Sequence, residues 1–182
     1  MTNNPWDVKG TPWRTEAAFW AWVRGQLRKG WMRHPVKHLF VKQNRFKSQN
    51  RRGKMTWHLV CASCGEQTPQ TEIHVDHKNG WNSFTKKSDI AEFVQRLYFV
   101  TYDDLQILCI PCHKIKTYQE RMQLDKFSDA AIHLEAKQVM KKNTKELKTW
   151  LENHGEEYLT PKPKNFETVL RILKCLSEGM YS

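Results

Sequence analysis

The chain has 182 residues, enough for one catalytic core and a smaller appendage but not for several large domains. It contains no apolar run of about 18 residues and no basic-then-apolar N-terminal signal, so we expect a soluble, cytoplasmic protein that does not associate with membranes. With 30 Lys and Arg against 19 Asp and Glu, the net charge of +11 favours a polyanionic partner.

Positive charge is concentrated in residues 17–65, which contain no acidic side chain and interleave Lys and Arg with Trp and Phe. Neutralised phosphates release counterions, and this release dominates non-specific affinity for nucleic acid. We therefore predict that the segment contacts nucleic acid. The contacts are assigned to five of its cations: Arg45, Lys47, Arg51, Arg52 and Lys54. The alternative is a solvated surface that serves solubility alone.

An amphipathic helix is predicted over residues 15–31, with Thr15 as its N-cap. Its apolar side chains recur at four-residue steps and should pack on the core: Phe19, Val23, Leu27 and Trp31. The polar segment 47–54 contains a glycine and predicts an exposed loop or a hairpin tip. Four tryptophans can either stack on bases or pack in the core, which is the commoner use: Trp20, Trp22, Trp31 and Trp57.

Two β-prone segments, 56–60 and 71–75, flank a short stretch with two cysteines and predict two strands joined through a turn. Residues 88–99 then predict a helix that Ser88 caps. Its apolar face is formed by Ile90, Phe93, Val94 and Leu97. A short apolar run at 105–109 follows, and Pro111 suits the first turn of another helix.

Beyond residue 127 the composition becomes charged and helical. Two helices are predicted there, over residues 128–154 and 165–176, separated by a segment rich in Gly and Pro. This part of the chain is interpreted as a helical extension.

Four of the five cysteines form two pairs, each with a two-residue gap: Cys61 with Cys64, and Cys109 with Cys112. Such a gap lets both thiolates of a pair face one ion, and two pairs complete a closed tetrahedral zinc site. The alternatives are two disulfides or buried thiols, and the lack of an export signal disfavours disulfides. Cys175 is left over and is interpreted as a core thiol of the last helix.

Asp76 and His77 are adjacent at the end of a predicted strand, and His113 directly follows the second cysteine pair. Adjacent strand residues face opposite ways, so Asp76 can bind a cation while His77 faces an attacking water. Zinc would fix the strand against the helix and bring the three side chains together. His74 lies on the same strand face as Asp76, either as an extra metal or substrate contact or, as we favour, as a hydrogen-bonded structural histidine.

The sequence Val-Asp-His-Lys at 75–78, followed by Asp-Asp-Leu-Gln-Ile-Leu-Cys-Ile-Pro-Cys-His at 103–113, resembles the HNH endonuclease family in its zinc-stapled, tailed-phage form. The motif order covers residues 61–117. The resemblance implies an α+β fold with a ββα-metal (His-Me finger) core, in which two strands and a helix surround one catalytic Mg²⁺ or related divalent ion. It also implies cleavage of phosphodiester bonds in DNA.

The resemblance assigns a role to each matched position. His77 is the general base that activates water, Asp76 and His113 hold the catalytic ion, and the four cysteines hold structural zinc. Asp104 stands where the family usually has Asn, and we favour a bracing role over that of a third ligand because the family already has its ligands. Lys114 and Lys116 either hold flanking phosphates or are ordinary lysines of a helix surface.

The leading hypothesis is a phage-encoded, metal-dependent endonuclease acting on double-stranded DNA. One alternative is a non-catalytic zinc-ribbon DNA-binding protein, and another is a nicking factor that depends on phage packaging or replication proteins. On this interpretation residues 1–54 are a basic DNA-contacting region, 55–125 the nuclease core and 126–182 the C-terminal helical extension.

Overall fold

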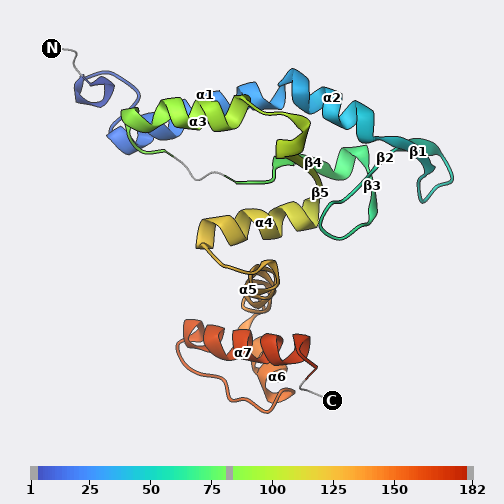
Figure 1. The fold of residues 1–182 in the computed structure, drawn as a ribbon. Coiled ribbons are helices and arrows are strands. Elements are labelled where there is room, and N and C mark those ends of the chain that lie inside the picture. Colours follow the sequence, from blue (N-terminus) through green and yellow to red (C-terminus); the bar gives the residue numbers. More distant parts are fainter. Residues whose placement is uncertain (1–3, 81–83, 180–182) are drawn as a thin grey trace. The chain divides into compact units, whose positions relative to one another are not determined.

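The computed structural model describes residues 4–80 and 84–179 of the chain. Within these residues it is an α+β protein with seven α-helices, α1 to α7, and two small antiparallel sheets (Figure 1). The chain divides into two compact units, residues 1–113 and 114–182, which are described separately. No helix of the described residues is long and apolar enough to cross a membrane.

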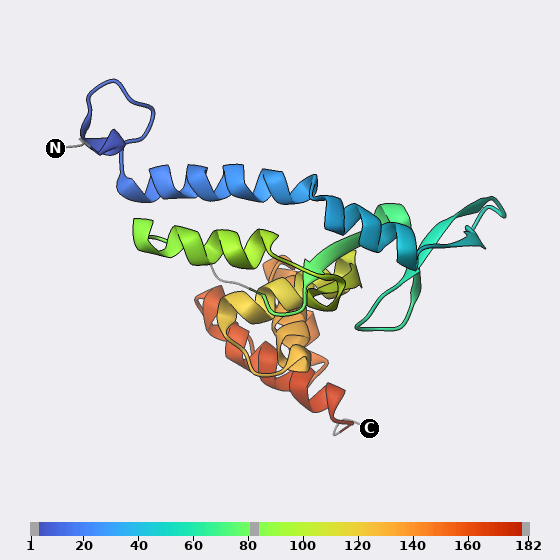
Figure 2. The ribbon, with the colours of Figure 1, turned by 45° about the horizontal axis from the view of Figure 1, so that its top comes forward.

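The predicted N-terminal helix is confirmed as α1, Glu16–Met32, and the Thr15 hydroxyl accepts the Ala18 N–H at 3.2 Å. The helix runs beside α3, Ile90–Tyr98, in both views (Figures 1 and 2). Buried rings from the two helices and the loop before α3 form their common core: Trp20, Phe84 and Phe93. The helices approach so closely at Gly30 that a Cβ there would collide with the Tyr98 hydroxyl.

The predicted Ser88 cap of α3 is wrong. Ser88 lies within a 3-10 turn, Lys87–Asp89, and its hydroxyl donates to Asp89 Oδ1 at 2.7 Å. Because this turn leads directly into α3, Asp89 takes the N-cap position, and no side chain caps the helix.

A hairpin follows the second helix, α2, Pro35–Asn44. Strands β1, Phe46–Gln49, and β2, Met55–Val60, pair antiparallel, with Lys47 opposite Trp57. The Asn50 side chain accepts the N–H groups of Arg52 and Lys54, both at 3.0 Å, which closes the turn. The predicted hairpin tip is therefore confirmed.

The prediction that strands 56–60 and 71–75 are joined is wrong. Strand β2 pairs instead with β3, Gln67–Pro69, which is the first stretch available after the cysteine turn. The next strand, β4, Ile73–His77, begins after a 3-10 turn, Gln70–Glu72, and belongs to a second sheet. Pro69 has no N–H to donate, which helps to end β3.

The second sheet consists of β4 and β5, Leu105–Cys109, paired antiparallel with Asp76 opposite Gln106. Helix α4, Ile110–Met122, begins at the residue after β5, with Pro111 in its first turn as predicted. Val75, Leu105 and Leu108 are buried. The second strand of this sheet thus leads directly into a helix.

The second unit contains α5, Phe127–Val139, α6, Thr144–Glu152, and α7, Phe166–Ser177. Their buried side chains form one core: Ala136, Val139, Leu147, Leu151, Val169, Ile172 and Leu173. The prediction of one helix over residues 128–154 is wrong, because Asn143 begins a new helix. Its side chain accepts the Glu146 N–H at 3.0 Å, and Glu146 accepts the Asn143 N–H at 3.4 Å.

Candidate metal and catalytic centres

The four cysteines predicted to bind zinc come together, with all sulfur atoms within 4.8 Å of one another. Cys61 and Cys64 follow β2, Cys109 ends β5 and Cys112 lies in the first turn of α4. The Sγ atoms of Cys64 and Cys109 are 3.9 Å apart. Tetrahedral zinc with bonds of about 2.3 Å requires sulfur separations of about 3.8 Å. This cluster can therefore hold a metal ion such as zinc.

The cysteine cluster is electrostatically asymmetric. Burial alone would raise the pKa of Cys61, but backbone N–H groups of Cys109, Cys64 and Ser63 donate to its sulfur and lower the pKa to about 6. Burial raises the pKa of Cys112 to about 12. Backbone hydrogen bonds thus favour the thiolate form of Cys61, whereas Cys112 would lose its proton when a cation binds.

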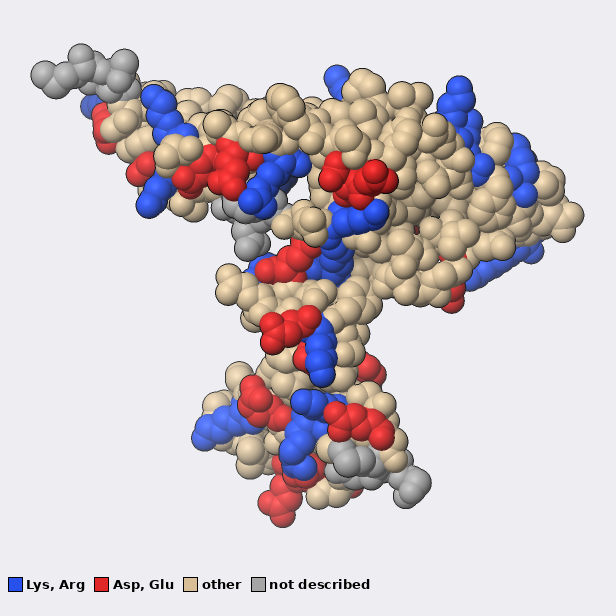
Figure 3. All heavy atoms as spheres, viewed as in Figure 1, with Lys and Arg blue, Asp and Glu red and all other residues tan. Residues whose placement is uncertain are grey.

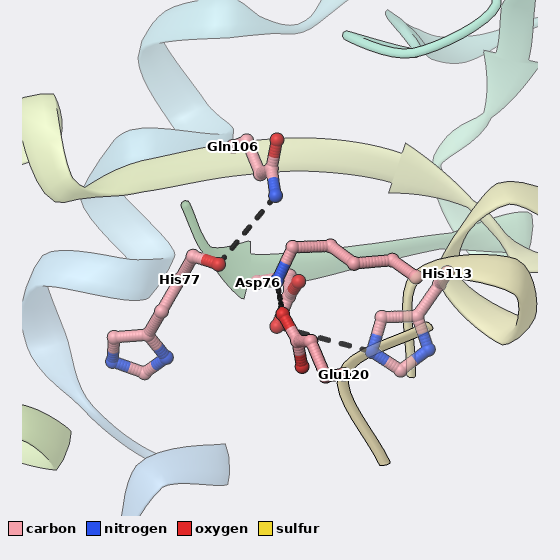
Figure 4. A network of polar contacts seen from close by, with 6 residues as sticks. Asp76, His77, Gln106, His113 and Glu120 are labelled. Atoms are coloured by element: carbon pink, nitrogen blue, oxygen red, sulfur yellow. Dashed lines mark hydrogen bonds and ion pairs between the residues drawn. The ribbon is translucent and has the colours of Figure 1, made fainter. Parts of the chain in front are cut away.

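A second pair of potential metal ligands joins β4 to α4. Asp76 Oδ1 lies 4.0 Å from His113 Nε2, and the two side chains are 21% and 30% exposed (Figure 4). A carboxylate oxygen and an imidazole nitrogen are donors that divalent cations accept. Among residues 4–80 and 84–179 only the cysteines form a tight group of three or more potential ligands, so this pair would need other ligands to complete a coordination shell.

His74 lies on the same face of β4 as Asp76, as predicted. Its ring stacks on that of His113, with centroids 4.3 Å apart and planes at 19°. Partial burial lowers the pKa of His74, and the nearby His113 and Lys37 lower it further. The residue is exposed overall and its ring contact is with His113, so His74 belongs to the surroundings of the Asp76–His113 pair, and the favoured interpretation as a hydrogen-bonded structural histidine stays a prediction.

The His77 ring points away from Asp76 and His113 (Figure 4). Its Nε2 lies 3.3 Å from the Leu97 carbonyl oxygen, and its ring packs on Trp31 with centroids 4.4 Å apart. The prediction that three side chains meet thus holds for Asp76 and His113, whereas His77 is held by α1 and α3. A pocket of about 410 Å³ opens beside His77, and its walls include Arg96, Phe99 and Asp104.

Asp104 braces the turn before β5. Its Oδ2 accepts the Thr101 N–H at 2.7 Å and the Thr101 hydroxyl at 2.8 Å, and these two bonds lower the pKa of the carboxyl. The Asp104 carbonyl oxygen accepts the Lys78 N–H at 2.8 Å. Gln106 Nε2 lies 3.5 Å from the His77 carbonyl oxygen (Figure 4). No role was predicted for Gln106 from the sequence, although it lies within residues 103–113, which resemble the HNH motif.

The hairpin carries the cations predicted to contact DNA. Arg45 and Lys47 lie over the ring of Trp57, at 4.1 and 4.4 Å from its centroid, and Trp57 is 37% exposed. Arg51, Arg52 and Lys54 are exposed at the turn. Figure 3 shows Lys and Arg along this end of the molecule. The structure thus adds Trp57 to the basic surface, as a platform that two cations share.

The two lysines predicted on α4 differ. Lys114 is exposed, and its contact with phosphate stays a prediction. Lys116 pairs with Glu120, and its side chain is only 13% exposed. That pairing opposes the prediction that Lys116 holds a phosphate.

Comparisons of the chain with protein-family models, with curated proteins and with solved structures found no match.

Proposed function

We propose that the chain is a divalent-metal-dependent DNA endonuclease of the HNH type. The observation that carries the proposal is the placement of Asp76 Oδ1 4.0 Å from His113 Nε2, while the ring of the adjacent His77 points away from this pair. This arrangement offers a cation-binding pair and a separate proton acceptor from strand β4 and helix α4.

In this proposal Asp76 and His113 hold the catalytic Mg²⁺ or a related ion, and the four cysteines hold zinc. The catalytic ion would stabilise the charge that develops on the phosphate. The zinc would tie the turn after β2 to the junction of β5 and α4. Since His113 follows Cys112 directly, the same ion would set the position of His113.

His77 is the proposed general base. Histidine changes protonation near neutral pH, so its ring can accept a proton from water. The contact of Nε2 with the Leu97 carbonyl oxygen favours a tautomer with the proton on Nε2, because a carbonyl accepts and cannot donate. Nδ1 is then the nitrogen that takes the proton.

DNA is the proposed substrate because the hairpin offers cations and an aromatic ring without nearby acidic residues in the sequence. Arg and Lys contact phosphates irrespective of sequence. Phage origin and dependence on packaging or replication proteins stay predictions of the family resemblance.

Cleavage of supercoiled plasmid tests the proposal. We expect nicked or linear products with purified protein and Mg²⁺, and none with EDTA or with His77→Ala. His38→Ala, which changes an exposed histidine on α2, is the matched control and should retain activity. Failure of the wild-type protein to cut any DNA with Mg²⁺, Mn²⁺ or Zn²⁺ would overturn the proposal.

A second candidate is a zinc-containing DNA-binding protein without catalysis. The observation in its favour is that the His77 ring packs against Trp31 instead of facing His113. Such a protein would bind DNA through the hairpin and would leave plasmid intact under all metal conditions. The plasmid experiment therefore separates the two candidates.

A further inference from the structure

Lys37, the third residue of α2, lies beside the surroundings of the proposed base. Its Nζ lies 5.8 Å from the centroid of the Trp31 ring, which is the ring that packs on His77. The ammonium group thus neighbours the aromatic ring that packs on the proposed base.

The environment of Lys37 is costly for a cation. The side chain is partly buried, and burial lowers its pKa. No carboxylate of the part of the chain that the structure describes forms an ion pair with it. The face of Trp31 offsets only part of the lost hydration. A bound anion would offset more, and a phosphodiester is the anion that the proposed function brings to this place.

We infer that Lys37 is a further catalytic residue, whose ammonium group binds a non-bridging oxygen of the scissile phosphate. The inference rests on the proposed function. When water attacks, its oxygen bonds to phosphorus and its proton passes to His77. The bond from phosphorus to one bridging oxygen breaks, and that oxygen leaves with the electron pair and takes a proton from solvent. Lys37 keeps its proton throughout and stabilises the charge on the phosphate.

An ordinary lysine of a basic surface would behave differently. Lys42 lies on the same helix, is exposed, and serves as the matched control. A surface lysine contributes to DNA affinity and little to the rate once DNA is bound. A lysine at the scissile phosphate contributes to the rate of the bound complex.

The test compares Lys37→Gln, Lys37→Arg and Lys42→Gln in single-turnover cleavage with saturating protein and Mg²⁺. We expect Lys37→Gln to lower the rate about 10²-fold, as loss of one charge-stabilising donor does, and Lys37→Arg to recover part of it. Lys42→Gln should cleave at the wild-type rate. Zinc content and thermal melting of each variant verify folding. A wild-type rate for Lys37→Gln, or a loss confined to DNA affinity, overturns the inference while leaving the proposed function intact.

A second measurement does not depend on activity. Lysines of the wild-type protein are acetylated in EDTA, with and without a DNA duplex, and quantified by mass spectrometry. Protection of Lys37 by DNA supports its contact with phosphate, and equal acetylation in both samples overturns it. If the wild-type protein does not cleave DNA at all, the proposed function fails, and this protection alone decides whether Lys37 binds phosphate.

Discussion

The ring of Trp31 packs on the ring of His77, with centroids 4.4 Å apart. Trp31 lies in the last turn of α1, and the Leu97 carbonyl that contacts His77 belongs to α3. The proposed base therefore contacts two helices, α1 and α3, besides the strand that carries it. The N-terminal region thus contributes to the surroundings of the proposed base as well as to the basic surface.

Replacement of Trp31 should reveal this contribution. We expect Trp31→Ala to lower the single-turnover cleavage rate at least about 10-fold, because a mispositioned base transfers protons poorly. Trp31→Phe keeps an aromatic face and should retain most of the rate. Trp22→Ala is the control, since Trp22 is 49% exposed on the same helix.

A structural role for Trp31 would change thermal stability without changing the pH dependence of cleavage. A positioning role should alter the rate profile between about pH 6 and pH 9, where a histidine base titrates. An unchanged profile for Trp31→Ala, with the rate also unchanged, would show that the stacking has no part in catalysis.

Removal of one cysteine ligand should destabilise the first unit. We expect purified protein to hold about one zinc per chain, and Cys61→Ser or Cys109→Ser to lower both zinc content and melting temperature, because metal binding is coupled to folding. Cys175→Ser changes a cysteine of the second unit and should leave the zinc content unchanged. Elemental analysis and thermal melting measure these effects. Folded, metal-free wild-type protein of equal stability would refute the zinc assignment.

The hairpin prediction concerns the dependence of DNA affinity on salt. Each phosphate contact in duplex DNA adds about 0.9 to the slope of log K against log salt, so Arg51→Ala, Arg52→Ala and Lys54→Ala together should reduce its magnitude by about 2 to 3. The control changes three exposed lysines of the second unit, Lys141, Lys142 and Lys145, to Ala. A reduced slope in the control and an unchanged slope in the hairpin variant would place DNA on the second unit.

Local patterns explain which elements the sequence predicts well. The apolar period of α1, the polar hairpin turn and Pro111 at the start of α4 are signals within one element. Strand pairing is not such a signal: the partner of β2 proved to be the three-residue β3, too short to show alternation. The start of a new helix at α6 could have been predicted from the sequence, since Asn143 and Glu146 have the spacing of a capping box.

The candidate site likewise has features that the sequence predicts and features that it does not. Spacing alone predicts the cysteine cluster, because a gap of two residues lets both thiolates of a pair face one ion. The surroundings of His77 include Trp31 and Leu97. Both are distant from His77 in sequence, and no sequence pattern indicates that they contact it. Lys37 was one cation among many in the basic segment, and its contact with Trp31 and its partial burial, which the sequence does not show, distinguish it.

Asp104 provides a pH-dependent test. Because its two hydrogen bonds from Thr101 depress the carboxyl pKa, the stabilisation is fully present above the unfolded pKa of about 3.9 and is lost as the pH falls through the lower folded value. Asp104→Ala should therefore melt below the wild type at neutral pH, and the difference should shrink as the pH falls below about 4. Thermal melting at several pH values measures it.

Activity of Asp104 variants separates bracing from metal binding. An Asn side chain can accept the same hydrogen bonds through its amide oxygen, so Asp104→Asn should cleave DNA with an unshifted Mg²⁺ midpoint. Asp104→Ala should lose about 10- to 100-fold in rate, because the turn that holds Lys78, next to His77, is no longer braced. A carboxylate binds a hard dication better than an amide does. A large upward shift of the Mg²⁺ midpoint in Asp104→Asn would therefore make Asp104 a third metal ligand and contradict the bracing role.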